Sequence, residues 1–594
     1  MTEPWGQRPG GPQVPMPQQV PGREPGCLIV CVAFVGLLGT LALASGFGQV
    51  DIGLVIFGLL LLAGPVWYFW FVVGRPGRER RAAEVRRAEQ QRRLAEWRAT
   101  RPAEQVNRHA DPLGAARWLT RESAGCAFLG LDANDKNWVV AHRQQAVLVL
   151  GPPRSGKTSS LIIPSVLTAS GPVVSTSTKA EIMRATARAR AKVGRIWLYD
   201  PSGTEEVPAG VLELNWSPIW SARTWDGARA MADAMVGASS AGEGVENGTY
   251  WSESSKTLLA PLLHAAALSG KTISDVRRWV SRADVVEAGR TLEAAGAELA
   301  ADDLDAVAAQ TEERERSSIF ASTRIVLTAY GSEQAAKRSM RQNFDADKFV
   351  RSADTVYITA PSHLQNNLAP LVAGLLEEIR DATYRYARSP QYSDRDSNPV
   401  LWALDEVANI APLKKLPGIV SEAGGQGLQV MACLQDLSQA RTRWGTAAEG
   451  FLSLFGTKVV FPGIGDRATL EALSMMVGDW DRPYLVFNTG TGTTTTYGIP
   501  TGRTQAQSNN DSWTHSTQRE ARVSAAEISN IPPGHALLVR SGHWSLVETT
   551  PYYSAAPWRA ALERAPRHIE PHGGPDHLPY FGPGSQAFAD RPTE

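Results

Sequence analysis

Residues 146–168 read AVLVLGPPRSGKTSSLIIPSVLT. An apolar run comes first, a loop of the pattern GxxxxGK followed by Ser or Thr comes next, and a stretch with helical periodicity comes last. A glycine-rich phosphate-binding loop requires this order of strand, loop and helix. The alternative, a glycine-rich turn that arose by chance, does not explain the apolar strand directly before it. The stretch therefore predicts a P-loop domain of the α/β class.

The residues of this loop have separate expected roles. Gly151 and Gly156 allow backbone N–H groups to wrap around phosphates, which the following helix N-terminus also favours. Lys157 would reach the β- and γ-phosphates, and the Thr158 hydroxyl would ligate Mg²⁺. The sequence thus predicts ATP and Mg²⁺ as cofactors. The residues expected to contact the nucleotide are Gly151, Pro152, Pro153, Arg154, Ser155, Gly156, Lys157, Thr158 and Ser159.

A second strand that ends in acidic residues is needed to complete such a site. Residues 399–413, PVLWALDEVANIAPL, supply an apolar run that ends in Asp405 and Glu406. Asp405 is expected to hold Mg²⁺ through water, and Glu406 is expected to orient and deprotonate the attacking water. The alternative is an acidic pair that only caps the next helix. With Lys157, Glu406 is therefore a predicted catalytic residue.

A third candidate strand lies in the stretch GLQVMACLQDLSQA at 427–440 and ends in Gln435. A neutral amide at this position could sense the γ-phosphate, so Gln435 is the third predicted catalytic residue. The alternative is a surface glutamine at the start of a helix.

The remaining pattern predicts how the domain is assembled. Further strand-like runs occur at 171–175, 195–199, 355–359 and 457–461, with helical stretches between them. Alternating strands and helices predict a RecA-like P-loop fold with a mainly parallel, doubly wound sheet. Asp405 lies 248 residues after Lys157, which is more than a compact core needs. We interpret residues 242–344, which are rich in Ala, Leu, Glu and Arg, as an inserted all-α domain between ATPase parts at 103–241 and 345–555.

The N-terminal region predicts a membrane anchor. Two apolar runs, 27–44 and 52–73, are each near the roughly 20 residues that a membrane-spanning helix needs. Arginines at and after Arg75 place the end of the second run in the cytoplasm. We expect two transmembrane helices within 27–74, an Arg-rich juxtamembrane helix at 75–102, and a two-pass plasma-membrane protein whose N-terminus and ATPase domain are cytoplasmic. A cleaved signal peptide ending near Ala44 is the alternative.

The composition sets limits on the rest. The 594 residues contain 60 Lys plus Arg and 60 Asp plus Glu, so net charge gives no sign of a nucleic-acid binder. The Pro/Gly-rich ends, 1–26 and 556–594, are expected to be disordered. No metalloprotease helix motif or nucleophile elbow occurs, so the predicted ATPase site carries the chemistry.

Several motifs follow the P-loop in a specific order. They are VVSTSTKAEI at 173–182, YDPSG at 199–203, NWSPI at 215–219, YWSESSKTLL at 250–259, LDEVANI at 404–410, CLQDLSQA at 433–440, FGTKVVFPGIGD at 455–466 and VSAAEISNIPPGHALLV at 523–539. Together with the two apolar runs, this order resembles the type IV secretion coupling proteins. These are the TraG/TraD-type conjugative DNA-transfer ATPases, which are related to the FtsK/HerA pumps. The sequence around the P-loop is similar to that of actinobacterial members in particular. The resemblance extends from the apolar runs to about residue 550.

The resemblance also implies an assembly, a cargo and a further site residue, none of which the motifs indicate by themselves. It implies a homo-hexamer that recruits a relaxase carrying single-stranded DNA, or protein substrates, and moves them into a type IV secretion channel by ATP hydrolysis. It also implies an arginine from a neighbouring subunit at the γ-phosphate, for which Arg324, Arg441 and Arg443 are candidates. The chain departs from the family at 177–181, where STKAE replaces an Asp-Pro-Lys-Gly-Glu run.

Two other functions fit parts of the sequence. An FtsK-like double-stranded DNA pump usually carries a C-terminal winged-helix module, for which the last 40 residues are too short and too rich in Pro and Gly. A membrane docking platform that uses nucleotide only as a switch has little need for a water-activating base such as Glu406.

Overall fold

The computed structural model describes residues 111–122, 125–242, 247–309, 312–393, 397–498, 502–554, 558–570 and 572–576. The predicted N-terminal tail, transmembrane helices and juxtamembrane helix, residues 1–26, 27–74 and 75–102, lie outside the described residues. Among the described residues, no helix has both the length and the apolar character that a membrane span requires.

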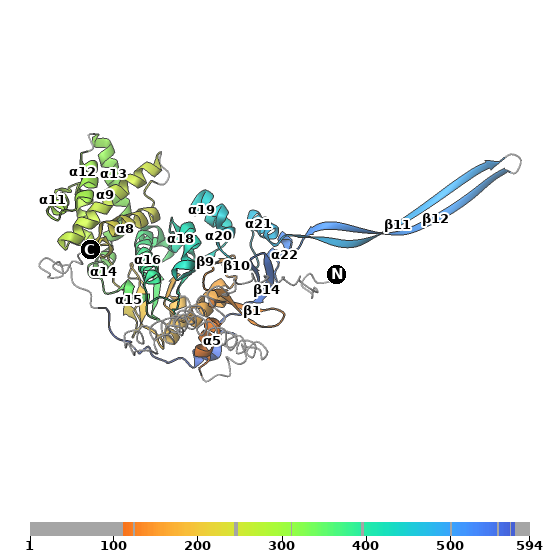
Figure 1. Ribbon diagram of the computed structural model, residues 1–594, viewed down its shortest axis with the longest axis horizontal. Helices are drawn as coiled ribbons and strands as arrows, with labels where there is room; N and C mark the ends of the chain where they lie inside the picture. Colours follow the sequence, from red (N-terminus) through yellow and green to blue (C-terminus); the bar gives the residue numbers. More distant parts are fainter. Residues whose placement is uncertain are drawn as a thin grey trace, which may run out of the picture. The chain divides into compact units, whose positions relative to one another are not determined.

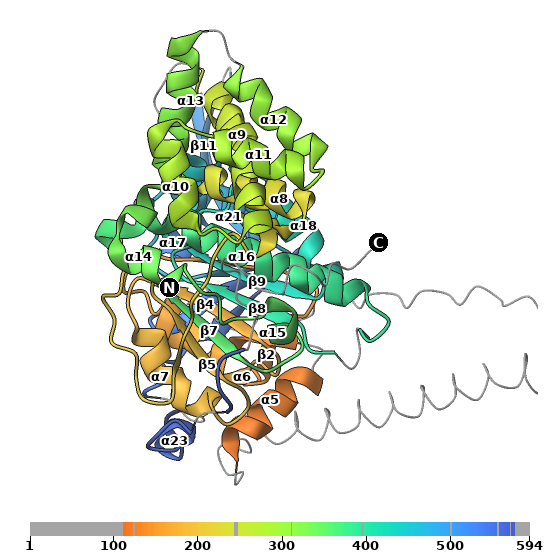
Figure 2. The ribbon, with the colours of Figure 1, turned by 90° about the vertical axis from the view of Figure 1, so that its left-hand side faces the viewer.

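A twelve-stranded sheet forms the centre of the described domain (Figures 1 and 2), and its strand order is β2-β1-β14-β13-β10-β3-β9-β8-β4-β7-β5-β6. From β10 to β6 every neighbouring pair is parallel, and from β2 to β10 every pair is antiparallel. The strands are β1 (Gly125–Asp132), β2 (Trp138–His142), β3 (Val147–Leu150), β4 (Val173–Ser177), β5 (Ile196–Tyr199), β6 (Leu212–Glu213), β7 (Thr355–Thr359), β8 (Val400–Leu404), β9 (Leu428–Leu434), β10 (Thr457–Val460), β13 (His535–Arg540) and β14 (His543–Glu548). The prediction of an α/β fold with a mainly parallel sheet is confirmed.

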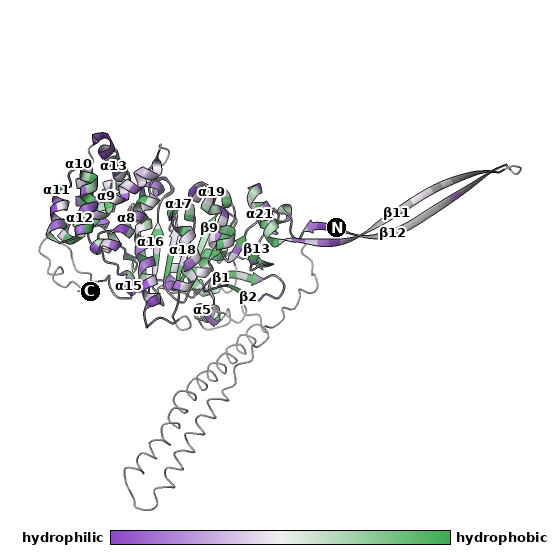
Figure 3. Cartoon of the chain, turned by 45° about the horizontal axis from the view of Figure 1, so that its top comes forward, coloured by the Kyte–Doolittle hydropathy of each residue, from purple (hydrophilic) through white to green (hydrophobic). Residues whose placement is uncertain are grey.

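The central strands β3, β8 and β9 are buried along their whole length because helices cover both faces of the sheet. Such burial is typical of parallel strands between two helical layers. Figure 2 shows α5, α6 and α7 on one side of the sheet and α16 and α17 on the other. In Figure 3 the hydrophobic colour is concentrated along the strands of the sheet, and the hydrophilic colour is more frequent on the helices around it.

The helices outside the insertion are mostly short, apart from α16. They are α5 (Pro112–Glu122), the π-helical turn η2 (Thr158–Ile162), α6 (Ile163–Thr168), α7 (Glu181–Arg190), α16 (Gln365–Arg388), α17 (Val407–Ile410), α18 (Leu416–Glu422), α19 (Leu437–Trp444), α20 (Phe451–Leu454), α21 (Arg467–Val477), α22 (Ala525–Ser529) and α23 (Trp558–Glu563). Single 3₁₀ turns are η3 (Ser221–Arg223), η4 (Thr328–Gly331), η5 (Ser362–Leu364), η6 (Ala423–Gln426) and η7 (Gly445–Gly450).

Helices fill the predicted all-α region, and the described residues between β6 and β7 contain no strand. The helices between these two strands are α8 (Trp225–Ala238), α9 (Gly248–Ser269), α10 (Ile273–Arg282), α11 (Val286–Ala294), α12 (Glu298–Ala308), α13 (Glu313–Val326), α14 (Glu333–Arg338) and α15 (Ala346–Phe349). Of these, α8 precedes and α15 follows the predicted range 242–344. The largely buried α9 packs against α8, α11, α12 and α13, so it forms the core of this region. The predicted limits of the three parts, 103–241, 242–344 and 345–555, stay predictions.

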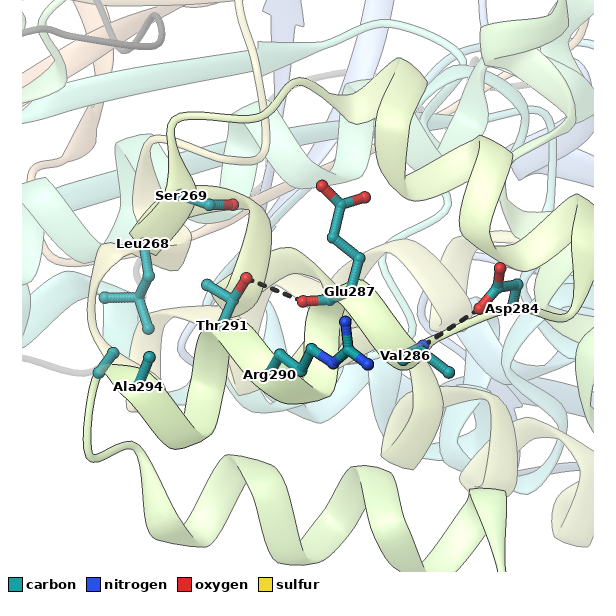
Figure 4. Close-up of a pocket in the computed structure, with 9 residues that line it drawn as sticks. Leu268, Ser269, Asp284, Val286, Glu287, Arg290, Thr291 and Ala294 are labelled. Carbon is teal, nitrogen blue, oxygen red and sulfur yellow. Dashed lines mark hydrogen bonds between the residues drawn. The ribbon is translucent and has the colours of Figure 1, made fainter.

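An open hollow of about 700 Å³ lies on this helical region, between the end of α9 and α11. Figure 4 shows Glu287, Arg290 and Thr291 of α11 beside it. Glu287 forms an ion pair with Lys271, at 2.9 Å between Nζ and Oε1. The hollow contains none of the predicted nucleotide-binding residues.

A long two-stranded hairpin, β11 (Asp479–Gly498) and β12 (Gly502–Ala521), lies between α21 and α22 (Figure 1). Its antiparallel register is continuous from Asp479 opposite Ala521 to Gly498 opposite Gly502. The Thr/Ser/Gly-rich sequence here is compatible with either an exposed loop or a hairpin, and the structure shows the hairpin.

The predicted disordered tail at 556–594 is wrong for its described part. Trp558 begins α23 and packs its ring 5.1 Å from Phe128 and 5.6 Å from Trp138, measured between centroids. Further on, the carboxylate of Asp576 lies 3.0 Å from the guanidinium of Arg195. Composition alone predicted disorder because it does not show these anchoring contacts.

Candidate nucleotide site

The P-loop begins where β3 ends, and both of its glycines are required by the backbone. The N–H of Gly151 points to the carbonyls of Leu434 and Gln435, at 3.2 and 3.1 Å. A Cβ at Gly151 would lie 2.7 Å from Cβ of Phe461, which is too close for any other residue. Gly156 has φ +99°, a conformation that side chains disfavour. The loop is therefore held tightly against β9 and β10.

Lys157 is folded back into this loop. Its ammonium donates to the carbonyl of Gly151 and, at 2.9 Å, to that of Pro152. Burial lowers the pKa of Lys157, while the nearby Cys433, Asp405 and Glu406 raise it. The cation thus lies where the loop backbone converges, in the position expected of a phosphate-binding lysine.

Thr158 and Asp405 meet although 247 residues separate them. The Thr158 hydroxyl donates to the Asp405 carboxylate at 2.7 Å, and the Thr176 hydroxyl donates to the Asp405 carbonyl at 3.1 Å. Asp405 is 7 % exposed, and burial raises its pKa against the opposing effects of Thr158 and Lys157. A hydroxyl from the first turn of the helix beside a carboxylate that follows a parallel strand is a donor set that fits Mg²⁺.

Glu406 follows Asp405 in a left-handed backbone conformation, with φ 54° and ψ 47°. Its carbonyl accepts from the N–H groups of Asn409 and Ile410, which starts α17. Non-glycine residues in this region cost of order 1 kcal/mol or more and are often found at functional sites. The partly exposed carboxylate stands beside the P-loop end of the sheet.

Gln435 also lies at this edge, because β9 runs between β3 and β8. Its carbonyl accepts from Gly151, and its N–H donates to the side chain of Gln439 at 2.9 Å. The structure therefore brings all three predicted catalytic residues to one edge of the sheet.

The other loop residues differ in exposure. Pro153 and Arg154 are exposed, and Arg154 has φ +64°. The Ser155 hydroxyl is buried with no hydrogen-bond partner among the described residues, and Ser159 donates to the Gly156 carbonyl at 3.3 Å. A bound phosphate would supply an acceptor for such a hydroxyl.

The three candidate arginines are occupied within the chain. Arg441 donates to Asp466 at 2.9 Å, Arg443 to the Pro412 carbonyl at 3.3 Å, and Arg324 to the Phe320 carbonyl at 3.4 Å. The structure does not choose among them.

Sequence reasoning missed two residues that support the site. Thr176 holds the Asp405 backbone from β4, and the backbone of Tyr552 donates to the Ser159 carbonyl at 3.0 Å. Thr176 directly follows the predicted strand at 171–175, which was a usable signal because the carboxyl ends of parallel strands share one edge. Nothing in the local sequence of Tyr552 points to the P-loop.

The family model described as "Type IV secretory system Conjugative DNA transfer" matches residues 108–555. The chain belongs to this family. Among solved structures, the conjugative coupling protein TrwBΔN70 in its unbound form is 18% identical, with a TM-score of 0.53 over 77% of this chain and 94% of that one. No curated protein sequence matches significantly.

Two further TrwB structures contain nucleotides. The complex with a non-hydrolysable GTP analogue is 18% identical, with a TM-score of 0.52 over 72% of this chain and 89% of that one. The complex with ADP and Mg²⁺ is 18% identical, with a TM-score of 0.51 over 70% and 88%. At this identity the likeness establishes that this member of the conjugative DNA-transfer family has the TrwB fold.

Proposed function

We propose that this chain is a membrane-anchored coupling ATPase that hydrolyses ATP to move DNA or protein substrates into a type IV secretion channel. The observation that carries the proposal is the contact between Thr158 and Asp405, with Lys157 and Glu406 at the same sheet edge. Membership of the conjugative DNA-transfer family supports the choice of cargo pathway.

The geometry supports separate roles for these residues in ATP binding and hydrolysis. The P-loop N–H groups and Lys157 bind and orient the triphosphate, and Thr158 with Asp405 would hold Mg²⁺, which neutralises phosphate charge. Glu406 orients a water molecule toward the γ-phosphorus and takes its proton as the bond to the leaving oxygen breaks. Gln435, at the end of the adjacent strand, contacts the γ-phosphate and reports its loss.

The proposal extends to assembly and location. Two transmembrane helices within 27–74 anchor the chain in the plasma membrane, with the ATPase domain in the cytoplasm. Six copies form a ring, in which an arginine of a neighbouring copy stabilises the charge on the γ-phosphate. The cargo is a relaxase-bound single strand of DNA, or a protein substrate, delivered to channel components.

The first test is ATP turnover by the full-length chain in detergent. We expect Lys157→Ala to abolish turnover, because the triphosphate loses its cationic partner. Lys192→Ala is the matched control, since Lys192 is an exposed lysine that follows the C-terminal end of α7. Full turnover by Lys157→Ala would remove the basis of the proposal.

The same assay separates the possible cargoes. Stimulation by single-stranded DNA that weakens with rising salt would support a DNA motor that contacts phosphates. Preference for double-stranded DNA would favour an FtsK-like pump. Turnover indifferent to all DNA would favour protein cargo, and tight ATP binding without turnover would favour a nucleotide-switched docking platform.

A further inference from the structure

A short segment after β14, Pro551–Ser554, is hydrogen-bonded to the helix that follows the P-loop. The N–H of Tyr552 donates to the Ser159 carbonyl at 3.0 Å. This contact joins residues almost 400 positions apart, so it is a feature of the tertiary fold.

The helix itself explains why that carbonyl is available. Residues Thr158–Ile162 form a π-helical turn, in which the N–H of Ile163 donates to the Thr158 carbonyl. In the same register, the Ser159 carbonyl would accept from residue 164. That residue is Pro164, which has no N–H. Tyr552 supplies the missing donor from outside the helix.

The location of this contact relates it to a bound nucleotide. In the proposed site, Lys157 contacts the β- and γ-phosphates, and Thr158 lies at the same end of the triphosphate as a ligand of Mg²⁺. The backbone N–H groups of the loop bind the α- and β-phosphates. The nucleoside therefore leaves the loop at the first turn of the helix, which includes Ser159. The Pro551–Ser554 segment lies against this turn.

The two tyrosines of the segment have different surroundings. Tyr552 is partly buried and packs against the hydrophobic core. Tyr553 is 61 % exposed, one of the most exposed large apolar side chains among the described residues. The rings lie edge to face, with centroids 5.3 Å apart and an interplanar angle of 78°. Tyr552 thus anchors the segment and supports the ring of Tyr553 at the surface.

We infer that Tyr553 is a base-binding residue, whose ring stacks on the purine of the nucleotide held by the P-loop. Stacking on an exposed aromatic ring accepts any base, and the larger purine ring gains more contact. The inference rests on the proposed nucleotide site and adds the group that contacts the base.

The test compares ligands with and without a base, using the full-length chain in detergent. We expect Tyr553→Ala to raise the Kd for ATP about tenfold. The Kd for inorganic tripolyphosphate should stay unchanged, because that ligand has no base. Tyr553→Phe should bind ATP like the parent chain, since stacking needs the ring and not the hydroxyl. Tyr250→Ala, at an exposed tyrosine of α9, is the matched control.

The outcomes separate this inference from the nucleotide site itself. An unchanged Kd for ATP in Tyr553→Ala, with Lys157→Ala still inactive, would overturn base stacking and leave the site standing. Equal weakening of ATP and tripolyphosphate would overturn it as well, because it would show a general disturbance of the P-loop. Failure of the parent chain to bind either ligand would overturn both proposals.

Discussion

Glu406 combines a strained backbone with a carboxylate next to the P-loop edge. Its left-handed conformation follows directly from the end of β8 and turns the chain into α17. A residue that only capped α17 would need no such strain, since an extended backbone with Ser, Thr, Asp or Asn serves as an N-cap. The geometry therefore favours a role for Glu406 in positioning or activating water.

The corresponding prediction concerns the rate of the chemical step. We expect Glu406→Gln to lower kcat for ATP by about 100-fold or more, because the amide cannot take a proton from water. The Kd for ATP should change little, since Gln has the same shape. Rapid-quench turnover and equilibrium binding measure the two quantities. Glu449→Gln, at an exposed glutamate, is the control, and an unaltered kcat in Glu406→Gln would contradict the assignment.

Residue-level reasoning from sequence predicted which side chains meet but not what supports them. Lys157, Thr158 and Asp405 could be placed together because parallel strands end at one edge of a sheet. The link from Tyr552 could not, because it depends on a π-helical turn and on the N–H that Pro164 lacks. Such contacts are set by tertiary geometry and leave no local pattern.

At the scale of elements, buried apolar runs were the strongest signal. The strands β4, β5, β7 and β10 lie within one or two residues of the predicted runs. The tail helix α23 was missed because a Pro/Gly-rich composition conceals one anchoring residue, Trp558. The hairpin β11–β12 stayed undecided because Thr, Ser and Gly suit both exposed strands and loops.

The long helix α16 carries an acidic residue at a buried position. Glu377 lies on α16 with its carboxylate 2.8 Å from the guanidinium of Arg380. Burial raises the pKa of Glu377 to about 7, together with the charges of Asp381 and Asp233 and against those of Arg380 and Lys415. The protonated form is therefore favoured by folding.

This raised pKa predicts a pH dependence of stability. Between the ordinary pKa of 4.5 and about 7, the folded chain binds more protons at Glu377 than the unfolded chain. Its contribution to stability is complete below pH 4.5 and is lost as the pH rises through 7. We expect Glu377→Gln to flatten this part of the Tm profile and to raise Tm at pH 8 by about 2 °C.

Thermal unfolding of the full-length chain in detergent, measured from pH 4.5 to 8.5, checks this prediction. Glu449→Gln is again a suitable control, because an exposed carboxyl should leave the profile unchanged. A Glu377→Gln profile that runs parallel to that of the parent chain would contradict the prediction, because it would show that folding does not shift the pKa of Glu377.

At the scale of the whole described domain, the helical region is tied to the chain just beyond Glu406. Asp233 of α8 forms an ion pair with Lys256 of α9 at 2.6 Å and a second one with Lys415, which directly precedes α18. Burial alone would raise the pKa of Asp233, but the hydrogen bonds from Lys256 and Lys415 outweigh it and lower the pKa. The carboxylate is thus ionised and shared by the two lysines.

The segment between α17 and α18, residues 411–415, also contacts an element that follows the candidate nucleotide site. Trp444, at the end of α19, donates to the Leu413 carbonyl at 2.8 Å, and α19 begins just after Gln435. The stretch between α17 and α18 therefore contacts the elements that follow Glu406 and Gln435, and also the helical region. We expect a movement of either strand end to reach Lys415, the partner of Asp233, through these contacts.

This arrangement predicts that the pair of Asp233 and Lys415 couples turnover to cargo. The side chain of Lys415 is 56 % exposed, so Lys415→Met should affect stability little. Asp233→Asn also removes the ion pair with Lys256. We expect Asp233→Asn and Lys415→Met each to reduce DNA stimulation of ATP turnover severalfold while basal turnover stays near that of the parent chain. The double variant should be no worse than Asp233→Asn alone, giving a coupling energy of about 0.5–2 kcal/mol in a double-mutant cycle. Lys192→Met controls for loss of a surface lysine, and strictly additive effects would show that the two residues act independently.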